Sequence, residues 1–143
     1  MSKIAIVFWS GTGNTETMAN AVEAGAKEAG AEVTRFSPAD FTEDKVADFD
    51  AIAFGCPAMG AEVLEESEVD PMFTALEQAS VLTGKKVGLF GSYGWGDGEW
   101  MRNWEERCRQ AGADLIYEGV ICNEAPDAAA TEACKKLGTD LSH

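Results

Sequence analysis

The sequence is poor in basic residues. Eleven Lys and Arg stand against 25 Asp and Glu, which gives a formal net charge of −14 at pH 7. Nucleic acid and anionic membrane surfaces repel a protein of this charge, so neither is expected as a partner. The negative charge favours a basic protein partner if the acidic residues cluster; scattered over the surface, they would only keep a small protein in solution.

Patterns for metal binding and thiol catalysis are missing. The single histidine is the last residue, His143, and the four cysteines, at positions 56, 108, 122 and 134, show no C-x-x-C spacing. Zinc sites and cysteine-protease sites need cysteine pairs or a partnering histidine, which this sequence lacks. We therefore expect no metal, no catalytic residues and four reduced thiols.

Long apolar runs are absent as well. No stretch is long and apolar enough to span a bilayer, and no basic region followed by a hydrophobic segment stands near the start. Nothing in the 143 residues indicates a second domain. We therefore expect one cytoplasmic domain over residues 1–143, large enough to bury a core without disulfides.

Apolar runs alternate five times with helix-period patterns. A parallel strand covered on both faces is apolar throughout, whereas a surface helix has one apolar stripe. The expected strands are 4–9, 31–36, 51–56, 87–90 and 115–122, and the expected helices run from the first loop to Ala29, from Glu65 to Ala79, from about Trp100 to Gly112 and from Pro126 to near Gly138. Right-handed crossovers then predict an α/β fold, an open doubly wound parallel sheet with helices on both faces.

Ligands of such sheets bind outside the carboxyl ends of the strands. The loops at 10–15, 57–62, 91–98 and 123–126 all follow expected strands, so they are predicted to share one edge of the molecule. The 91–98 segment is expected to be a loop throughout, because it is too rich in glycine for a regular element.

The first of these loops, Ser10-Gly11-Thr12-Gly13-Asn14-Thr15, has the composition of a phosphate-binding loop. Its glycines let the backbone approach a phosphate, its other side chains are neutral donors, and the following helix start attracts an anion. A nucleoside triphosphate loop would need a lysine, and a dinucleotide loop would need a third glycine where Glu16 stands. The predicted ligand group is therefore one terminal phosphate, with a plain helix cap as the alternative.

Two large side chains in the other loops suggest a flat ligand. Trp95 stands between two glycines, where it is difficult to bury in the core, and is interpreted as a stacking plate. Met59 is interpreted as the cover of the opposite face. Trp100 and Trp104 have helical spacing and are expected in the core. The sequence thus predicts a planar aromatic ligand that carries one phosphate.

These loops resemble those of the short-chain flavodoxins of anaerobic bacteria, the clostridial-like type, and the resemblance covers essentially the whole chain. It implies a flavodoxin-like five-stranded sheet of order 2-1-3-4-5 and non-covalently bound FMN. The implied cofactor-binding residues are Ser10, Gly11, Thr12, Gly13, Asn14 and Thr15 at the phosphate, then Pro57, Ala58, Met59, Gly60, Ala61 and Glu62, and finally Ser92, Tyr93, Gly94, Trp95, Gly96 and Asp97. By the same resemblance, Met59 and Trp95 flank the ring and Glu62 accepts a hydrogen bond from the flavin N3–H. Ala61 departs from the polar residue that many relatives carry.

The resemblance also implies a function. The chain is expected to be a monomeric, low-potential one-electron carrier that shuttles between semiquinone and hydroquinone, rather than an enzyme. The Gly60-Ala61 peptide would turn its carbonyl towards the flavin N5–H and so stabilise the semiquinone.

Acidic residues in or just after the edge loops would oppose the second electron and attract the basic surfaces of redox enzymes. They are Glu62, Glu65, Glu66, Glu68, Asp70, Asp97, Glu99, Glu124 and Asp127.

Two other functions are alternatives to a one-electron carrier. The first is an FMN-dependent NAD(P)H quinone or nitro-compound reductase, for which the chain has no added segment to bind a nicotinamide. The second is a signalling receiver module, which needs acidic residues after the first and third strands, where Ser10-Gly11 and Cys56-Pro57 stand.

Overall fold

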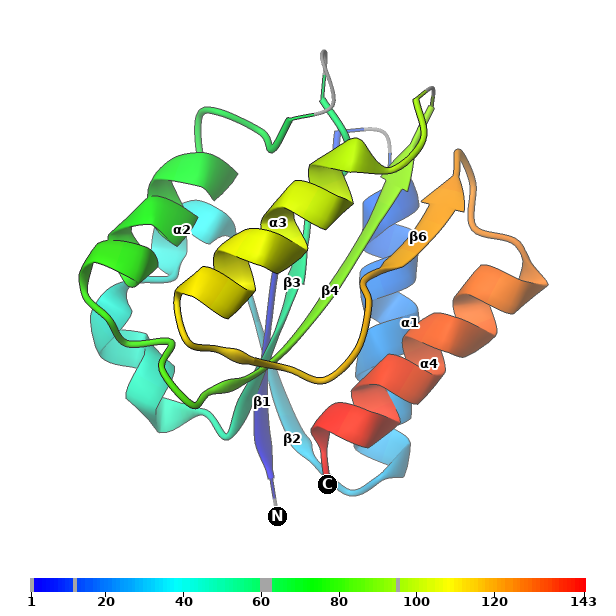
Figure 1. Cartoon of the computed structure of the whole chain (residues 1–143). Helices are drawn as coiled ribbons and strands as arrows, with labels where there is room; N and C mark the ends of the chain where they lie inside the picture. Colours follow the sequence, from blue (N-terminus) through cyan, green and yellow to red (C-terminus); the bar gives the residue numbers. More distant parts are fainter. Residues whose placement is uncertain (1, 12, 60–62, 95) are drawn as a thin grey trace.

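A parallel β-sheet forms the centre of the computed structural model, which describes residues 2–11, 13–59, 63–94 and 96–143 (Figure 1). The strands are β1 (Lys3–Phe8), β2 (Glu32–Phe36), β3 (Ala51–Gly55), β4 (Lys86–Tyr93), β5 (Asp114–Leu115) and β6 (Val120–Asn123). Their order is β2-β1-β3-β4-β5, and β6 also pairs with β4. The predicted doubly wound sheet and its strand order are confirmed.

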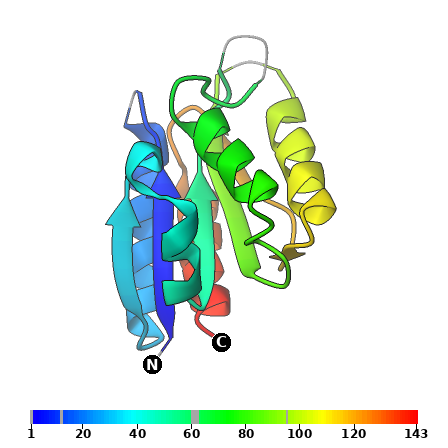
Figure 2. The same ribbon diagram turned by 90° about the vertical axis from the view of Figure 1, so that its left-hand side faces the viewer.

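Helices cover both faces of the sheet (Figures 1 and 2). The helices α1 (Asn14–Glu28) and α4 (Ala128–Leu141) lie on one face, and α2 (Val69–Gln78) and α3 (Glu99–Gln110) lie on the other. Two short 3-10 helices, η1 (Pro38–Asp40) and η2 (Glu43–Asp48), connect β2 to β3. Within the described residues, no helix is long and apolar enough to cross a membrane.

The core consists of two apolar layers, because successive strand residues point to opposite faces. The layer beneath α2 and α3 is aromatic: Phe54 and Phe73 meet edge to face at 5.4 Å between ring centroids, and Phe73 meets Trp104 at 5.9 Å. Trp100 and Trp104 are each 1% exposed. Their predicted place in the core is therefore confirmed.

The layer beneath α1 and α4 depends on a close helix crossing. A Cβ added at Gly25 would lie 1.9 Å from the carbonyl oxygen of Lys135, and one added at Gly138 would lie 2.0 Å from that of Val22. Helix α4 continues through Gly138 to Leu141, so the predicted end near Gly138 is wrong. The glycine there permits close packing of the two helices and does not stop α4.

The predicted fifth strand is divided into two pieces. Strands β5 and β6 both pair with β4, but residues 116–119 between them lie outside both strands. The buried carboxylate of Glu105 in α3 accepts a hydrogen bond of 2.7 Å from the backbone N–H of Gly119. A Cβ at Gly119 would lie 2.5 Å from the sulfur of Met101. These contacts with α3 account for the interruption.

Strand β4 is longer than predicted. It continues through Gly91 and Ser92 to Tyr93 and pairs there with β6, so the expectation of a loop from residue 91 is wrong. Strand β4 requires a glycine at position 91, because a Cβ there would lie 2.1 Å from the carbonyl oxygen of Cys56. The glycine allows a close backbone approach within the sheet.

Helix α2 begins at Val69, four residues later than predicted. The carboxylate of Glu65 accepts hydrogen bonds from the backbone N–H groups of Ser67 (2.8 Å), Glu68 (2.7 Å) and Val69 (3.1 Å). Glu65 therefore caps the helix from outside it. Pro71 lies in the first turn, where its missing N–H breaks no helical hydrogen bond.

Candidate functional site

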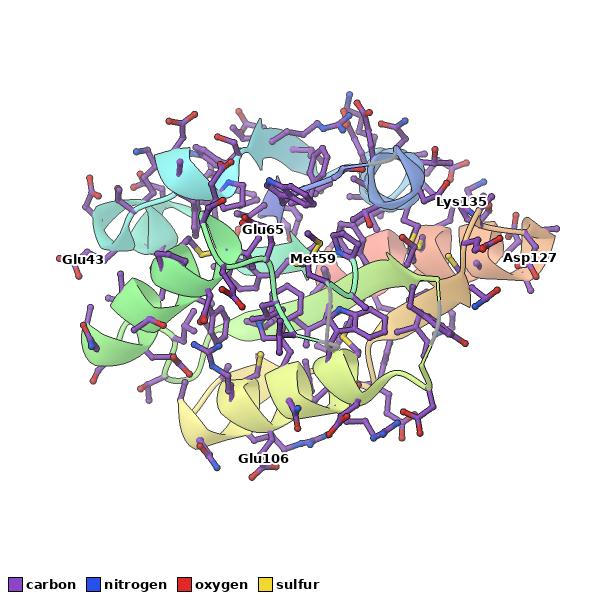
Figure 3. All side chains as sticks on the ribbon, turned by 90° about the horizontal axis from the view of Figure 1, so that it is seen from above. Glu43, Met59, Glu65, Glu106, Asp127 and Lys135 are labelled. Carbon is purple, nitrogen blue, oxygen red and sulfur yellow. The ribbon has the colours of Figure 1, made fainter. Side chains whose placement is uncertain are left out.

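The loops that follow β1, β3, β4 and β6 meet at one edge of the sheet, at the top of Figure 1, and both termini lie at the opposite edge. Figure 3 looks down on the loop edge: Met59 lies near its centre, whereas Asp127 lies at the periphery beside α4. This is the edge at which doubly wound sheets bind their ligands.

At this edge lies a cavity of about 450 Å³, which is within the usual size range of ligand pockets. It is formed by the start of α1, the segment after β3, the end of β4 and the loop after β6. Its lining residues are Asn14, Pro57, Ala58, Ser92, Tyr93, Gly94, Glu124 and Ala125. The first six are predicted site residues, brought together from three segments of the chain. Glu124 was predicted as an acidic residue of this edge but not as part of the cofactor site, and Ala125 was missed, because no side chain in their loop suggested a contact with the ligand.

The start of α1 presents backbone donors at one end of the edge. The N-cap residue is Gly13, with φ of +96°, and it makes no side-chain cap. The hydroxyl oxygen of Ser10 accepts hydrogen bonds from the N–H groups of Gly13 (3.1 Å) and Glu16 (3.3 Å). The first-turn N–H groups of a helix have no partner within the helix, so an anion can bind there.

Ser92, near the end of β4, connects this strand to the start of α1 and to the segment after β3. Its hydroxyl oxygen lies 3.3 Å from that of Thr15, and both side chains are buried. Its carbonyl accepts a hydrogen bond of 3.0 Å from the N–H of Ala58. The α1 start, the segment after β3 and the end of β4 are thereby held together.

The segment after β3 is closed at its base by Cys56. The Cys56 thiol donates to the carbonyl of Pro57 (3.3 Å), and its sulfur accepts from the N–H of Glu65 (3.4 Å). Burial raises the pKa of this thiol to about 12, so it is protonated at neutral pH and can donate. Further out, Met59 and Val63 form an antiparallel bridge with hydrogen bonds of 3.0 and 3.1 Å.

Other predicted site residues lie apart from the cavity. Ser10 lines a neighbouring hollow of about 380 Å³ between the ends of β1 and β2. Asp97 pairs with Arg102 at 3.0 Å, and Gly96 has φ of +93°. Gly11 lies beside the ring of Trp9. Five predicted residues lie outside the described residues: Thr12, Gly60, Ala61, Glu62 and Trp95.

The acidic edge is weaker than the sequence suggested. Glu65 is only 5% exposed and its carboxylate caps α2, so its place on an acidic surface is a wrong prediction. Asp70 pairs with Arg107 at 2.9 Å, and Asp97 with Arg102. The other described members of the set are Glu66, Glu68, Glu99, Glu124 and Asp127, of which Asp127 caps α4 through the N–H of Ala130.

The residues present fit FMN. The α1 start offers neutral backbone and hydroxyl donors without a lysine, which suits a phosphate monoester, and the adjoining cavity has room between loops for a flat ring. Within the described ranges, no group of three or more His, Cys, Asp or Glu side chains could hold a metal ion. When bound, FMN supplies the one-electron redox chemistry, and the chain supplies binding, orientation and the local charge.

Comparison with known proteins gives a consistent result. The profile of the family described as Flavodoxin matches residues 6–138. The chain is 55% identical to a flavodoxin of Megasphaera elsdenii over 135 residues, covering 94% of this chain and 95% of the relative, and 44% identical to one of Clostridium beijerinckii, covering 96% and 98%. The solution structure of two-electron reduced Megasphaera elsdenii flavodoxin superposes with a TM-score of 0.88 at 53% identity, over 97% of this chain and 98% of that one. This chain therefore belongs to the flavodoxin family of FMN-binding electron-transfer proteins.

Proposed function

We propose that this flavodoxin is a low-potential carrier that accepts and donates electrons one at a time, with its FMN held at the loop edge. The observation that carries the proposal is the cavity of about 450 Å³ at the loop edge, which the first residue of α1 helps to line. A phosphate attached to a larger flat group would use both the cavity and the α1 start. The high identity to flavodoxins supports a carrier and gives no support to a quinone or nitro-compound reductase.

The proposed roles follow from the chemistry of the residues. The Ser10 hydroxyl and the first-turn N–H groups from Asn14 onward would donate to the phosphate, as would Thr12. Pro57 and Ala58 would form one wall for the ring and Tyr93 and Gly94 the other, with Met59 and Trp95 as the stacking side chains. Gly60, Ala61 and Glu62 would supply the hydrogen bonds to the flavin ring that the family resemblance implies.

The negative charge of the molecule supports the proposed low reduction potential. Glu124 lines the cavity, and a carboxylate there opposes the addition of further negative charge. The acidic edge would also attract basic surfaces of redox enzymes into a small, short-lived complex. All four cysteines are free and buried, which supports action in a reducing compartment such as the cytoplasm. We further propose that the chain acts as a single domain and a monomer.

Anaerobic redox titration of the FMN-loaded protein tests the carrier function. The visible spectrum is recorded during stepwise reduction, and two separate one-electron steps are expected. Bleaching in a single two-electron step, above all by a reduced nicotinamide, would instead favour the reductase.

Binding measurements test the phosphate site separately. Ser10→Ala should weaken FMN binding about fivefold while leaving riboflavin, which has no phosphate, unchanged. Ser2→Ala is the control, because Ser2 bonds to Ser142 at the opposite edge. Equal loss for both flavins would remove the phosphate role, and no FMN binding by the native chain would reduce residues 10–15 to a helix cap.

A further inference from the structure

The segment that carries Met59 leaves the sheet through Cys56, and both sides of this residue's backbone are held. Its N–H donates to the carbonyl of Phe90 in β4 at 3.1 Å. Its carbonyl accepts a hydrogen bond of 3.0 Å from the indole nitrogen Nε1 of Trp100 in α3. This second bond is buried, since Trp100 is 1% exposed. A carbonyl that loses its donor in such a place cannot turn to water, so the bond constrains the peptide strongly.

The sequence of β4 makes room for this bond. A Cβ at Gly91 would lie 2.1 Å from the carbonyl oxygen of Cys56 and 3.2 Å from the Trp100 ring. Only glycine leaves the carbonyl and the indole free to meet at this point. Strand β4, the Cys56 carbonyl and α3 therefore form one packed unit.

Trp100 also contacts the other wall of the cavity. Its ring lies 5.6 Å from that of Tyr93, measured between centroids, and Tyr93 lines the cavity of about 450 Å³. Trp100 itself is not among the residues that line it. One buried side chain thus joins the segment after β3 to the end of β4 from behind the site.

We propose that Trp100 is a positioning residue for the cofactor, which fixes the segment from Pro57 onward through its indole N–H and the Tyr93 wall through its ring. The proposal rests on the proposed FMN site. Trp100 does not line the cavity. The proposal gives it an indirect role in cofactor binding and redox tuning, through the peptide that leads into the Met59 segment. Loosening this peptide should weaken FMN binding and alter the potentials, beyond any loss of stability.

The chain provides a matched control in Trp104. It lies one turn further along α3 and is also 1% exposed, but its Nε1 has no hydrogen-bond partner among the described residues. Its ring packs against Phe54 and Phe73 in the core. Trp100→Phe and Trp104→Phe therefore remove the same ring volume, and only the first removes a hydrogen bond to the cofactor segment.

The test compares these two variants with the native chain. Urea unfolding of the FMN-free proteins should show both variants destabilised. Trp100→Phe should raise the Kd for FMN about fivefold or more, as expected for one lost hydrogen bond, and should change the separation between the two one-electron potentials. Trp104→Phe should leave the Kd within about twofold and the potentials unchanged. Native-like FMN binding by Trp100→Phe, or equal losses in both variants, would overturn the proposal.

A measurement on the native chain covers the case in which Trp100→Phe does not fold. Because coupling between two sites is reciprocal, FMN should slow hydrogen exchange of the Trp100 indole N–H more than that of Trp104, as followed by NMR. Equal effects on the two indoles would contradict the positioning role. Absence of FMN binding by the native chain would instead contradict the proposed function, so the two failures are distinguishable.

Discussion

The backbone conformation at Glu124 positions this acidic residue beside the cavity. Its φ is +58°, its N–H donates to the carbonyl of Tyr93 at 2.7 Å, and the residue is one of those that line the cavity. Residues other than glycine seldom adopt this conformation, so the bond to Tyr93 helps to hold Glu124 there. Its carboxylate consequently belongs to the electrostatic surroundings of the site.

We expect Glu124→Gln to raise the lower one-electron potential. A carboxylate on the order of 10 Å from an added charge shifts a potential by roughly 10 to 40 mV at low ionic strength, depending on the effective dielectric constant. Redox titration against reference dyes measures the shift. Glu32→Gln, at the start of β2 on the opposite edge, is the control and should leave the potential unchanged. Equal shifts in both variants would mean that only the net charge matters.

The start of α2 depends on the ionised form of Glu65. Burial alone would raise the pKa of this carboxyl group, but hydrogen bonds from the Ser67 hydroxyl and from three backbone N–H groups outweigh it and hold the pKa below 4.5. The stabilisation is therefore fully present above pH 4.5 and is lost as the pH falls through the lowered pKa.

We expect Glu65→Gln to lower the free energy of unfolding at pH 7 by about 1–2 kcal/mol, because the charge-assisted cap is weakened. Urea unfolding over a pH series checks this. The difference from the native chain should shrink as the pH falls below about 4.5, the ordinary pKa of the group. The exposed neighbour serves as the comparison: Glu66→Gln should have little effect at any pH, and a variant of Glu65 that behaves in the same way would contradict the cap.

The crossing of α1 and α4 reverses an ordinary rule of helix stability. Replacing a helical glycine by alanine normally stabilises a protein. Gly25→Ala and Gly138→Ala should instead each lower the free energy of unfolding by roughly 1–3 kcal/mol, because the new methyl group meets the carbonyl of the facing helix. Thermal and urea unfolding measure the effect. A stabilised variant would show that the two helices separate easily.

Sequence patterns predicted the elements better than their ends. A continuous apolar run between two helix-period patterns indicates a parallel strand, because helices cover both faces of such a sheet. The ends depend on contacts between distant residues: Glu105 bonds to Gly119 where the predicted fifth strand breaks, and Glu65 moves the start of α2. Gly138 was interpreted as a helix stop because glycine is common at helix ends. Its actual role is the close contact with α1, which the sequence of α4 alone does not reveal.

The same distinction holds for the site. Strand topology sufficed to bring together six predicted residues around one cavity, since parallel strands direct their loops to a single edge. Trp100 was correctly predicted to be buried, but its spacing contains no sign that its indole bonds to Cys56. A pairing across 44 positions is fixed by packing and leaves no local pattern.

At the scale of the whole molecule, the net charge of −14 should make the redox behaviour depend on salt. We expect the lower one-electron potential to rise by tens of millivolts from low to high ionic strength, because salt screens the exposed carboxylates. Glu65, Asp70 and Asp97 contribute little to this response, being buried or paired. Potentiometry in a salt series provides the measurement, and a flat response would mean that surface charge does not set the potential.

The site at the loop edge is assembled from both ends of the chain. Helix α1, whose start is the proposed phosphate site, packs on α4, where the Thr139 hydroxyl donates to the carbonyl of Gly25 across 114 positions. Ser92 pairs in register with Cys122. During synthesis on the ribosome, the first half of the chain therefore emerges without the surfaces that hold it in shape. We therefore expect a translation product that ends before α4 to retain no FMN, because α1 then lacks the helix on which it packs.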